Sequence, residues 1–274
     1  MFLCHERFAA PVLFLISTLS LIGCGDDSVS LAPTASPVTS MITPLNDTGI
    51  TWGSNYPNGN NTTCIGETIS QQDCSHGRDV THDDSNGRAG FDYTKLNANG
   101  TPLSASDTEW SCIKDNVTGL IWEMKVGGND VRGDEGLHDA DDRFNWYNTD
   151  PKTNGGVEGY SDNDGSICYG YNANIPASYC NTQSYVARVN NASLCGANNW
   201  RLPTLFELLN LVSLDRASPS IDTTYFPNTQ SMFYWSSSPY FYQPGNAWSV
   251  SFDNGESNSN PGDGHHVRLV RLDQ

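Results

Sequence analysis

The stretch PTLFELLNLV, residues 203–212, has the pattern of a capped amphipathic helix. Thr204 and Glu207 stand three residues apart, which is the spacing of a capping box at a helix N-terminus. The apolar side chains that follow recur at helical spacing. They are Leu205, Leu208, Leu209 and Val212. The sequence therefore predicts a helix that starts at this box and buries one face.

A second helix and a short strand are predicted upstream. Residues 182–191 place Tyr185, Val186 and Val189 on one helical face. Residues 120–123 (LIWE) form a short run that is typical of a strand. The local pattern therefore supports two helices.

The C-terminal segment alternates as antiparallel strands do. Residues 248–252 (WSVSF) alternate large apolar side chains with serine, and the turn residues DNG follow at 253–255. Val267, Leu269 and Arg271 alternate again. Because this period places one face in the core and one in water, we expect antiparallel hairpins here.

Composition agrees with a loop-rich α+β fold. The chain is rich in Gly, Asn, Asp, Ser and aromatic residues, and few long amphipathic runs occur. Such residues favour turns and short strands around a small number of helices. We therefore expect two helices, short antiparallel strands and long loops.

The N-terminus has the features of an export signal. Arg7 is followed by an uncharged stretch, residues 8–22, and then by Gly23 and Cys24. The stretch is too short to span a bilayer, which takes about 20 apolar residues, and it suits a cleaved secretory signal. The sequence LIGC is similar to the lipobox of bacterial lipoproteins, so Cys24 is the expected lipidation site. An ordinary signal peptide with an incidental cysteine is the alternative.

The segment after Cys24 is poor in large apolar side chains and cannot offset its own ordering entropy. We divide the chain into a signal peptide (1–23), a flexible tether (24–45), an N-terminal extension (46–105) and a main domain (106–274). Gly25 after the anchor favours the outer membrane over the inner one, by the sorting rule of lipoproteins. The expected location is the cell envelope, with a membrane contact through the lipid.

The charge balance is strongly acidic. The sequence has 31 acidic and 14 basic side chains, a formal net charge of −17. Nucleic acid is therefore not an expected partner, because polyanion binding depends on Lys and Arg that neutralise phosphates. Residues 130–164 hold ten acidic and three basic side chains and form the most acidic loop region.

The cysteines predict a disulfide framework. Apart from Cys4 in the signal and Cys24, six remain, an even number in an oxidising compartment. None of them forms a C-x-x-C pair, which disfavours a metal site. We expect Cys64 to pair with Cys74 and Cys168 with Cys180, which leaves Cys112 and Cys195 to close a long loop. Six cysteines nevertheless allow 15 connectivities.

Several spaced segments together resemble one known family. The segments are WSCIKDNVTGLIWE (110–123), LCG (194–196), WRLPT (200–204), EL (207–208), FPN (226–228), YWSSS (234–238), WSV (248–250) and VRLVR (267–271). In this order they resemble the Lcl C-terminal domain family, named after the tip domain of a bacterial collagen-like adhesin. The resemblance covers about residues 106–272.

This resemblance implies a fold similar to C-type lectins and to sulfatase-modifying enzymes, and a role in adhesion. The named family member is implicated in adhesion to sulfated polysaccharides, which an acidic loop surface would repel. The sulfatase-modifying enzymes use cysteines late in the chain, whereas none follows Cys195 here. We therefore expect no catalytic residues.

Two side-chain types invite a functional interpretation that we weigh against a structural one. Arg201 at the helix start is expected to direct its donors at carbonyls or a carboxylate. Four tryptophans are expected to anchor the core, although any ring left exposed could stack on a sugar face. They are Trp122, Trp200, Trp235 and Trp248.

Oxygen-rich loops make Ca²⁺ the only cofactor to consider. The segments 138–142 (HDADD) and 162–165 (DNDG) suit calcium, although neither completes an EF-hand loop. The candidate ligands are Asp139, Asp141, Asp142, Asp162 and Asp164. The alternative is a solvated acidic loop.

Together these features predict a non-catalytic surface binding or adhesion module, with a glycan or a surface protein as ligand. We expect the loops between about residues 126 and 178 to carry the binding and Ca²⁺ to support any glycan contact. A structural envelope lipoprotein without a soluble ligand is the second possibility, and a sulfatase-modifying type of enzyme is the third.

Overall fold

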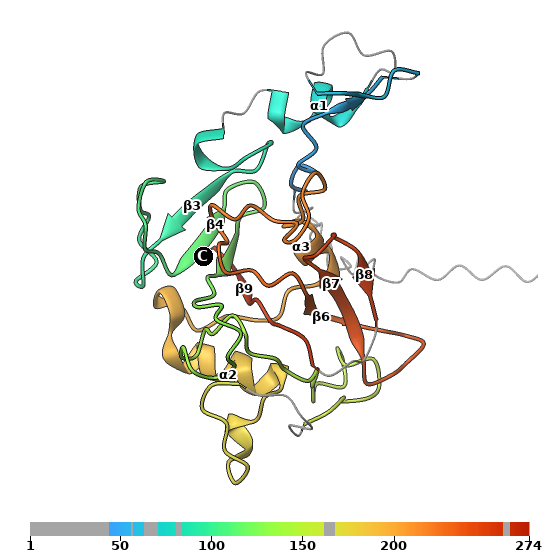
Figure 1. Cartoon of the computed structure of the whole chain (residues 1–274). Helices are drawn as coiled ribbons and strands as arrows, with labels where there is room; N and C mark the ends of the chain where they lie inside the picture. The colour runs from blue at the N-terminus through green and yellow to red at the C-terminus, as the bar shows by residue number, and fades with distance from the viewer. Residues whose placement is uncertain are drawn as a thin grey trace, which may run out of the picture. The chain divides into compact units, whose positions relative to one another are not determined.

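The fold is built from short strands and helices joined by long loops, as Figure 1 shows. The computed structural model describes residues 44–55, 57–62, 71–80, 84–161, 168–259 and 264–273. These residues all belong to one compact unit that spans Ile42–Gln274. Cys24, Cys64, Asp162, Asp164 and the signal peptide lie outside the described residues.

The strands of the described residues form three small antiparallel sheets. The two-stranded sheet pairs β1 (Gly53–Ser54) with β2 (Asn60–Asn61). The four-stranded sheet has the order β3 (Tyr93–Leu96), β4 (Cys112–Asp115), β5 (Leu120–Glu123) and β9 (Val270–Leu272). The three-stranded sheet has the order β6 (Phe233–Pro239), β7 (Ala247–Ser251) and β8 (Ser257–Asn258).

Three α-helices lie in the described part of the chain: α1 (Asp73–His76), α2 (Thr182–Ala192) and α3 (Leu205–Leu209). Short 3₁₀ turns join them to the loops: η1 (Arg78–Val80), η2 (Asp84–Asn86), η3 (Pro176–Ser178) and η4 (Leu194–Gly196). The coarse α+β prediction is therefore confirmed, with one more short helix than expected.

The two predicted helices start at side-chain caps. Asn181 accepts a hydrogen bond from the backbone amide of Ser184 and so caps α2. The predicted capping box of α3 is present, because Thr204 and Glu207 each accept from the other's backbone amide. Helix α3 ends at Leu209, earlier than the periodicity suggested, and the buried Leu211 and Val212 follow in tight turns.

The last strand departs from the expected hairpin. Strands β7 and β8 form the hairpin, but β9 pairs with β5, about 150 residues upstream, in the register Leu120 to Leu272. The side chains of this segment are buried on both faces, including those of Val267, Leu269 and Arg271. Neither face is therefore exposed to solvent, in contrast to the prediction. Alternation predicts a strand, but it does not say which edge the strand completes.

Two apolar clusters form the core, and β5 contributes to both because successive side chains of a strand point to opposite faces. Trp122 packs with Tyr93, Leu208 and Tyr234 in the first cluster. Ile121 packs in the second, which also holds Phe144, Tyr185, Trp200 and Trp235. Three of the four tryptophans are therefore core anchors, and Trp248 is half-buried.

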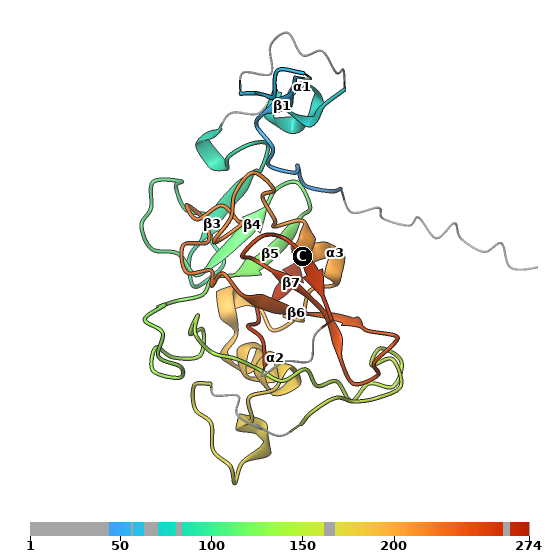
Figure 2. The ribbon, with the colours of Figure 1, turned by 45° about the vertical axis from the view of Figure 1, so that its right-hand side comes forward.

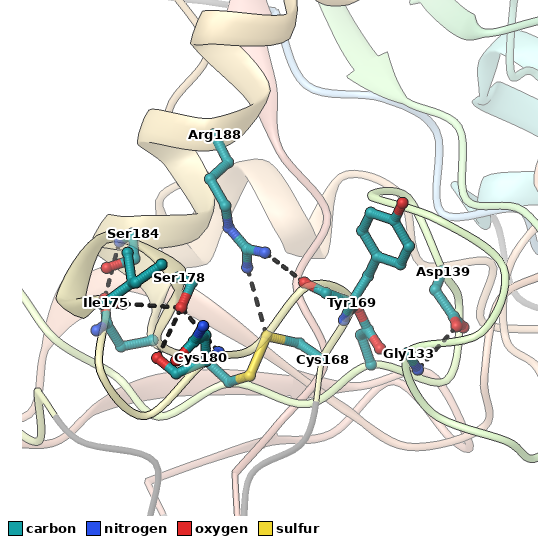
Figure 3. The surroundings of a disulfide bond; sticks show 12 residues. Gly133, Asp139, Cys168, Tyr169, Ile175, Ser178, Cys180, Ser184 and Arg188 are labelled. Atoms are coloured by element: carbon teal, nitrogen blue, oxygen red, sulfur yellow. Dashed lines mark hydrogen bonds between the residues drawn. A yellow bond between two sulfur atoms is a disulfide. The ribbon is translucent and has the colours of Figure 1, made fainter.

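Two predicted disulfides are present. Cys112 of β4 is joined to Cys195, directly after α2, and Cys168 is joined to Cys180, directly before α2. Figure 3 shows the second bridge, with Arg188 donating to the carbonyl of Tyr169 at 2.5 Å and to the Cys168 sulfur at 3.4 Å. Cys74 is also disulfide-bonded, while its expected partner Cys64 lies outside the described residues.

Candidate functional site

A groove of about 750 Å³ lies beside the N-termini of α2 and α3, and we name it the α2–α3 groove. Its apolar floor includes Trp146, Val186, Leu202 and Pro239. The other lining residues are Tyr147, Asn148, Lys152, Thr153, Gly155, Thr182, Gln183, Arg201, Thr204, Ser237 and Ser238. The groove therefore collects residues from four separate stretches of the chain.

Polar contacts fix one wall of the groove to the first turn of α2. The Thr182 hydroxyl donates to the Tyr147 carbonyl at 2.9 Å and accepts from the Tyr147 amide at 3.0 Å. Gln183 Oε1 accepts from the Thr149 amide at 2.9 Å and from its hydroxyl at 3.0 Å. Because the loop is tied at both points, the backbone of the half-buried Tyr147, which lines the groove, is held in place.

Arg201 and the start of α3 form the opposite wall. Its guanidinium makes two hydrogen bonds to Glu207, at 2.8 and 2.7 Å, as a bidentate pair. Burial alone would raise the pKa of Glu207, but the guanidinium and the Thr204 amide hold the pKa below its usual range. The structural interpretation of Arg201 is therefore confirmed, and Glu207 offsets its charge.

The described lining of the groove holds two cations on an acidic chain. Lys152 and Arg201 are the charged side chains among the described residues that line it, and these residues include no Asp or Glu. Two carboxylates contact the lining side chains, since Glu207 pairs with Arg201 and Glu158 accepts from the Tyr147 hydroxyl at 3.3 Å. The exposed ammonium of Lys152 forms no ion pair with another described residue. With a formal net charge of −17 for the whole chain, this is one place where a carboxylate could approach without meeting a lining acid.

The polar edge of the groove can donate and accept hydrogen bonds. Within the described residues, the Gln183 side-chain amide nitrogen and the Ser237 hydroxyl keep their hydrogen-bonding capacity for a ligand. An apolar floor with a few fixed polar groups is the usual composition of a small-ligand site. The arrangement can hold a molecule that has both an apolar face and hydroxyl groups.

The three described calcium candidates have other partners. Asp139 Oδ2 accepts from the amides of Gly133, Asp134 and Glu135 at 3.1 to 3.2 Å, and its Oδ1 accepts from the Asp141 amide at 2.8 Å. Asp141 accepts from the Asp130 amide and from Gln230, both at 2.8 Å. Asp139 and its bond to Gly133 are drawn in Figure 3.

Asp142 is buried as well, and burial raises its pKa to about 6. Its Oδ2 accepts from the Tyr169 amide at 2.8 Å. Within the described ranges, no three His, Cys, Asp or Glu side chains are grouped to hold a metal ion. Asp139, Asp141 and Asp142 thus serve as buried acceptors within their own loop. The calcium site, whose other two candidate ligands lie outside the described residues, stays a prediction.

The sequence predicts binding by the loops between about residues 126 and 178, and of the described groove lining the segment 146–155 falls inside that range. The other walls come from α2, from the start of α3 and from the end of β6. No local pattern marks Tyr147 or Lys152, because the fold alone brings them to Arg201. The WRLPT segment at 200–204, which contributes Arg201 to the lining, is the feature of the sequence that comes nearest to marking the groove.

Comparison with known proteins gives one match. The family model described as the Lcl C-terminal domain matches residues 111–271, more than half of the chain. Neither the curated proteins nor the solved structures contain a match. Among the described residues, none of the helices is long and apolar enough to cross a membrane. The matched span includes every residue that lines the α2–α3 groove, and the chain belongs to the Lcl C-terminal domain family.

Proposed function

We propose that this protein is a non-catalytic binding module of the cell envelope that holds a glycan of low charge density in the α2–α3 groove. The observation that carries the proposal is the lining of the groove. The same groove is lined by Tyr147, by an apolar floor, by Gln183 and Ser237, and by Lys152, whose ammonium forms no ion pair with another described residue. No other charged group of the lining remains uncompensated, since Arg201 is paired with Glu207.

A sugar ring suits this lining because it presents C–H groups on its faces and hydroxyls around its edge. The C–H face would lie on Tyr147 and the apolar floor, and the hydroxyls would meet Gln183 and Ser237. Lys152 would pair with one carboxylate, so neutral sugars and sugars with a single uronate fit best. A densely sulfated chain would meet the net negative field of the protein.

Family membership and the element composition support a C-type-lectin-like fold for this domain, and we include that fold in the proposal. Small antiparallel sheets, long irregular loops and disulfides that flank α2 are features that such a fold would have. Because a fold does not fix a function, the lining of the groove carries the argument. A structural envelope lipoprotein, which would have no soluble ligand, is the alternative that a binding assay tests.

We also propose that Cys24 anchors the chain in the outer membrane, on the strength of the sequence around it. Several acyl chains on one residue suffice for stable anchoring. Cys24→Ser should move the protein from the membrane fraction to the soluble fraction. Continued membrane fractionation and labelling of the variant by a fatty-acid probe would contradict the anchor.

We assign no calcium to the groove, because none of the described residues that line it carries a carboxylate. Glycan retention should therefore survive a chelator such as EDTA. Asp162 and Asp164 stay the sequence-based candidates for calcium, and calorimetry with CaCl₂ on the double Asn variant tests them separately.

The groove is tested on a glycan array that carries neutral, uronate and sulfated oligosaccharides, probed with the full chain and its variants. Tyr147→Ala should lower affinity about tenfold, since a stacked ring contributes on the order of 1 kcal/mol beyond buried area. Lys152→Met should weaken uronate binding selectively. Arg132→Met, a cation in a different hollow, should change nothing. Equal binding by all variants would remove the groove from the proposal.

A further inference from the structure

The loop between β6 and β7 exposes two neighbouring aromatic rings. Phe241 is 86% exposed and Tyr242 is 80% exposed. Residues 239–247 (PYFYQPGNA) contain no charged side chain. Exposed large aromatic rings that stand together, in contrast to single ones, mark a contact surface.

The loop is held by internal contacts that leave the two rings outside. The Tyr240 amide donates to the Asn246 carbonyl at 2.9 Å, and the Asn246 amide donates to the Gln243 carbonyl at 3.1 Å. The Tyr240 ring stands edge-on against Trp248, with centroids 4.9 Å apart. Tyr242 packs on Tyr240 with centroids 5.8 Å apart. A ligand would therefore meet rings whose backbone is already ordered, which lowers the entropic cost of binding.

The same loop is continuous with the α2–α3 groove. Pro239 lines the groove, and Phe241 follows it two residues later. A Cβ on Gly155 would come within 2.7 Å of the Pro239 side chain, so these two segments are in tight contact. A Cβ on Gly245 would lie 3.3 Å from the Val157 side chain and 3.8 Å from the Gly159 Cα. Figure 2 shows the two loops side by side at one edge of the molecule.

We propose that Phe241 and Tyr242 form a second stacking subsite, which takes a further sugar of the same glycan chain whose first sugar lies in the groove. This inference rests on the proposed function of the groove. It means that the ligand is an oligosaccharide or polysaccharide and not a monosaccharide. Pro239 lines the groove and stands two residues before Phe241, so the two sites are neighbours along the chain and one oligosaccharide would occupy both.

Charge disfavours a membrane as the occupant of this loop. Loops that bind membrane surfaces usually add Lys or Arg for the anionic headgroups, and this loop has none in a chain of formal net charge −17. Aromatic faces without neighbouring charge suit the C–H face of a sugar.

The test compares chain lengths on the full chain carrying Cys24→Ser. The probes are the dimers and hexamers of five series: cello-, xylo-, manno-, chito- and galacturono-oligosaccharides. In each series that binds, the hexamer should bind at least tenfold more tightly than the dimer, because two ring contacts are added and each contributes on the order of 1 kcal/mol. The double variant Phe241→Ala/Tyr242→Ala should bind the hexamer only as well as the dimer and should keep its dimer affinity.

Phe206→Ala is the matched control, because Phe206 is 73% exposed and lines a different hollow. It should leave the hexamer affinity unchanged, and the thermal midpoints of all variants should agree. Equal dimer and hexamer affinities, or an unchanged double variant, would overturn the second subsite and leave the groove standing. Absence of binding in all five series would overturn both proposals. Loop-dependent binding to phosphatidylcholine–phosphatidylglycerol vesicles, with no length effect, would make the loop a membrane contact instead.

Discussion

Glu123 lies at the centre of a buried polar network that joins distant parts of the chain. Its Oε1 accepts from Lys125 at 3.3 Å and from the Tyr185 hydroxyl, and it lies 2.8 Å from His138 Nδ1. Its Oε2 accepts from the Leu269 amide at 2.9 Å. Burial alone would raise the pKa of Glu123, but Lys125, His138 and Tyr185 together lower the pKa to about 2.

This network makes a prediction about acid stability. Because the folded pKa of Glu123 lies below its unfolded value of 4.5, the unfolded chain binds more protons between these values. The contribution of Glu123 is therefore fully present above pH 4.5 and is lost as the pH falls towards about 2. Glu123→Gln should lower the free energy of unfolding at pH 7 by about 3–5 kcal/mol, since it leaves the Lys125 ammonium buried and unpaired.

Urea denaturation of the wild type and of Glu123→Gln at a series of pH values measures this difference. The exposed Glu109→Gln is the control and should stay within about 0.5 kcal/mol of the wild type. A difference that stays constant from neutral to acidic pH would show that Glu123 acts through its shape and not its charge.

The role of a residue could be predicted only where its hydrogen-bonding partners lie nearby in the sequence. Arg201 and Glu207 lie six residues apart, and the capping box between Thr204 and Glu207 made their role visible in the sequence. Glu123 gave no such signal, because Tyr185 and Leu269 lie 62 and 146 residues away. In the same way, nothing in the sequence around Asp139 reveals that it accepts from four backbone amides of its own loop.

At the scale of elements, helix α2 is fastened at both ends by disulfides. The bridge before it closes a short loop, with a sequence separation of 12, and the bridge after it ties the chain back to β4 across a separation of 83. The closure entropy of the unfolded chain grows with the length of the loop. The two bridges should therefore stabilise the fold unequally.

The double variant Cys112→Ala/Cys195→Ala should lose about 4–5 kcal/mol of unfolding free energy, and Cys168→Ala/Cys180→Ala about 3 kcal/mol. All four cysteines are buried, so alanine at each position removes a comparable amount of packing. Urea denaturation under non-reducing conditions gives both values. Reduction of the wild type serves as the control, because it should cost at least as much as the larger of the two. A greater loss from the short bridge would contradict the entropic account.

Elements were predicted well where one strand or helix carries its own signal. Helix α2 and strand β5 were found within one residue of the expected bounds, because periodicity and capping are local. The partner of β9 could not be predicted, since its pairing with β5 depends on the whole core. The α2–α3 groove could not be predicted for the same reason, as Tyr147 and Arg201 come to line one groove only after the chain has folded.

At the scale of the whole molecule, the position of the charges matters more than their sum. The chain has a formal net charge of −17, yet the charged side chains among the described residues that line the groove are the cations Lys152 and Arg201. Part of the acidity is also hidden, because Asp139, Asp141 and Asp142 are buried. A ligand in the groove therefore meets a weakly basic site inside a negative field.

This arrangement fixes the sign of the salt effect for each class of glycan. A sulfated polysaccharide such as heparin is repelled by the net negative charge of the protein. Added salt weakens this repulsion, because the electrostatic screening length is already about 10 Å at 0.1 M salt. The weak binding of heparin should therefore stay unchanged or become stronger as salt is added. A neutral oligosaccharide has no charge to screen, and its affinity should change less than about twofold between roughly 50 and 500 mM NaCl. Affinity electrophoresis of the full chain through gels that contain each glycan measures both trends. The variant Lys152→Met should weaken heparin binding further and leave the neutral glycan unaffected. A steep loss of heparin affinity with salt would instead show that counterion release dominates and that the groove cations outweigh the field of the chain.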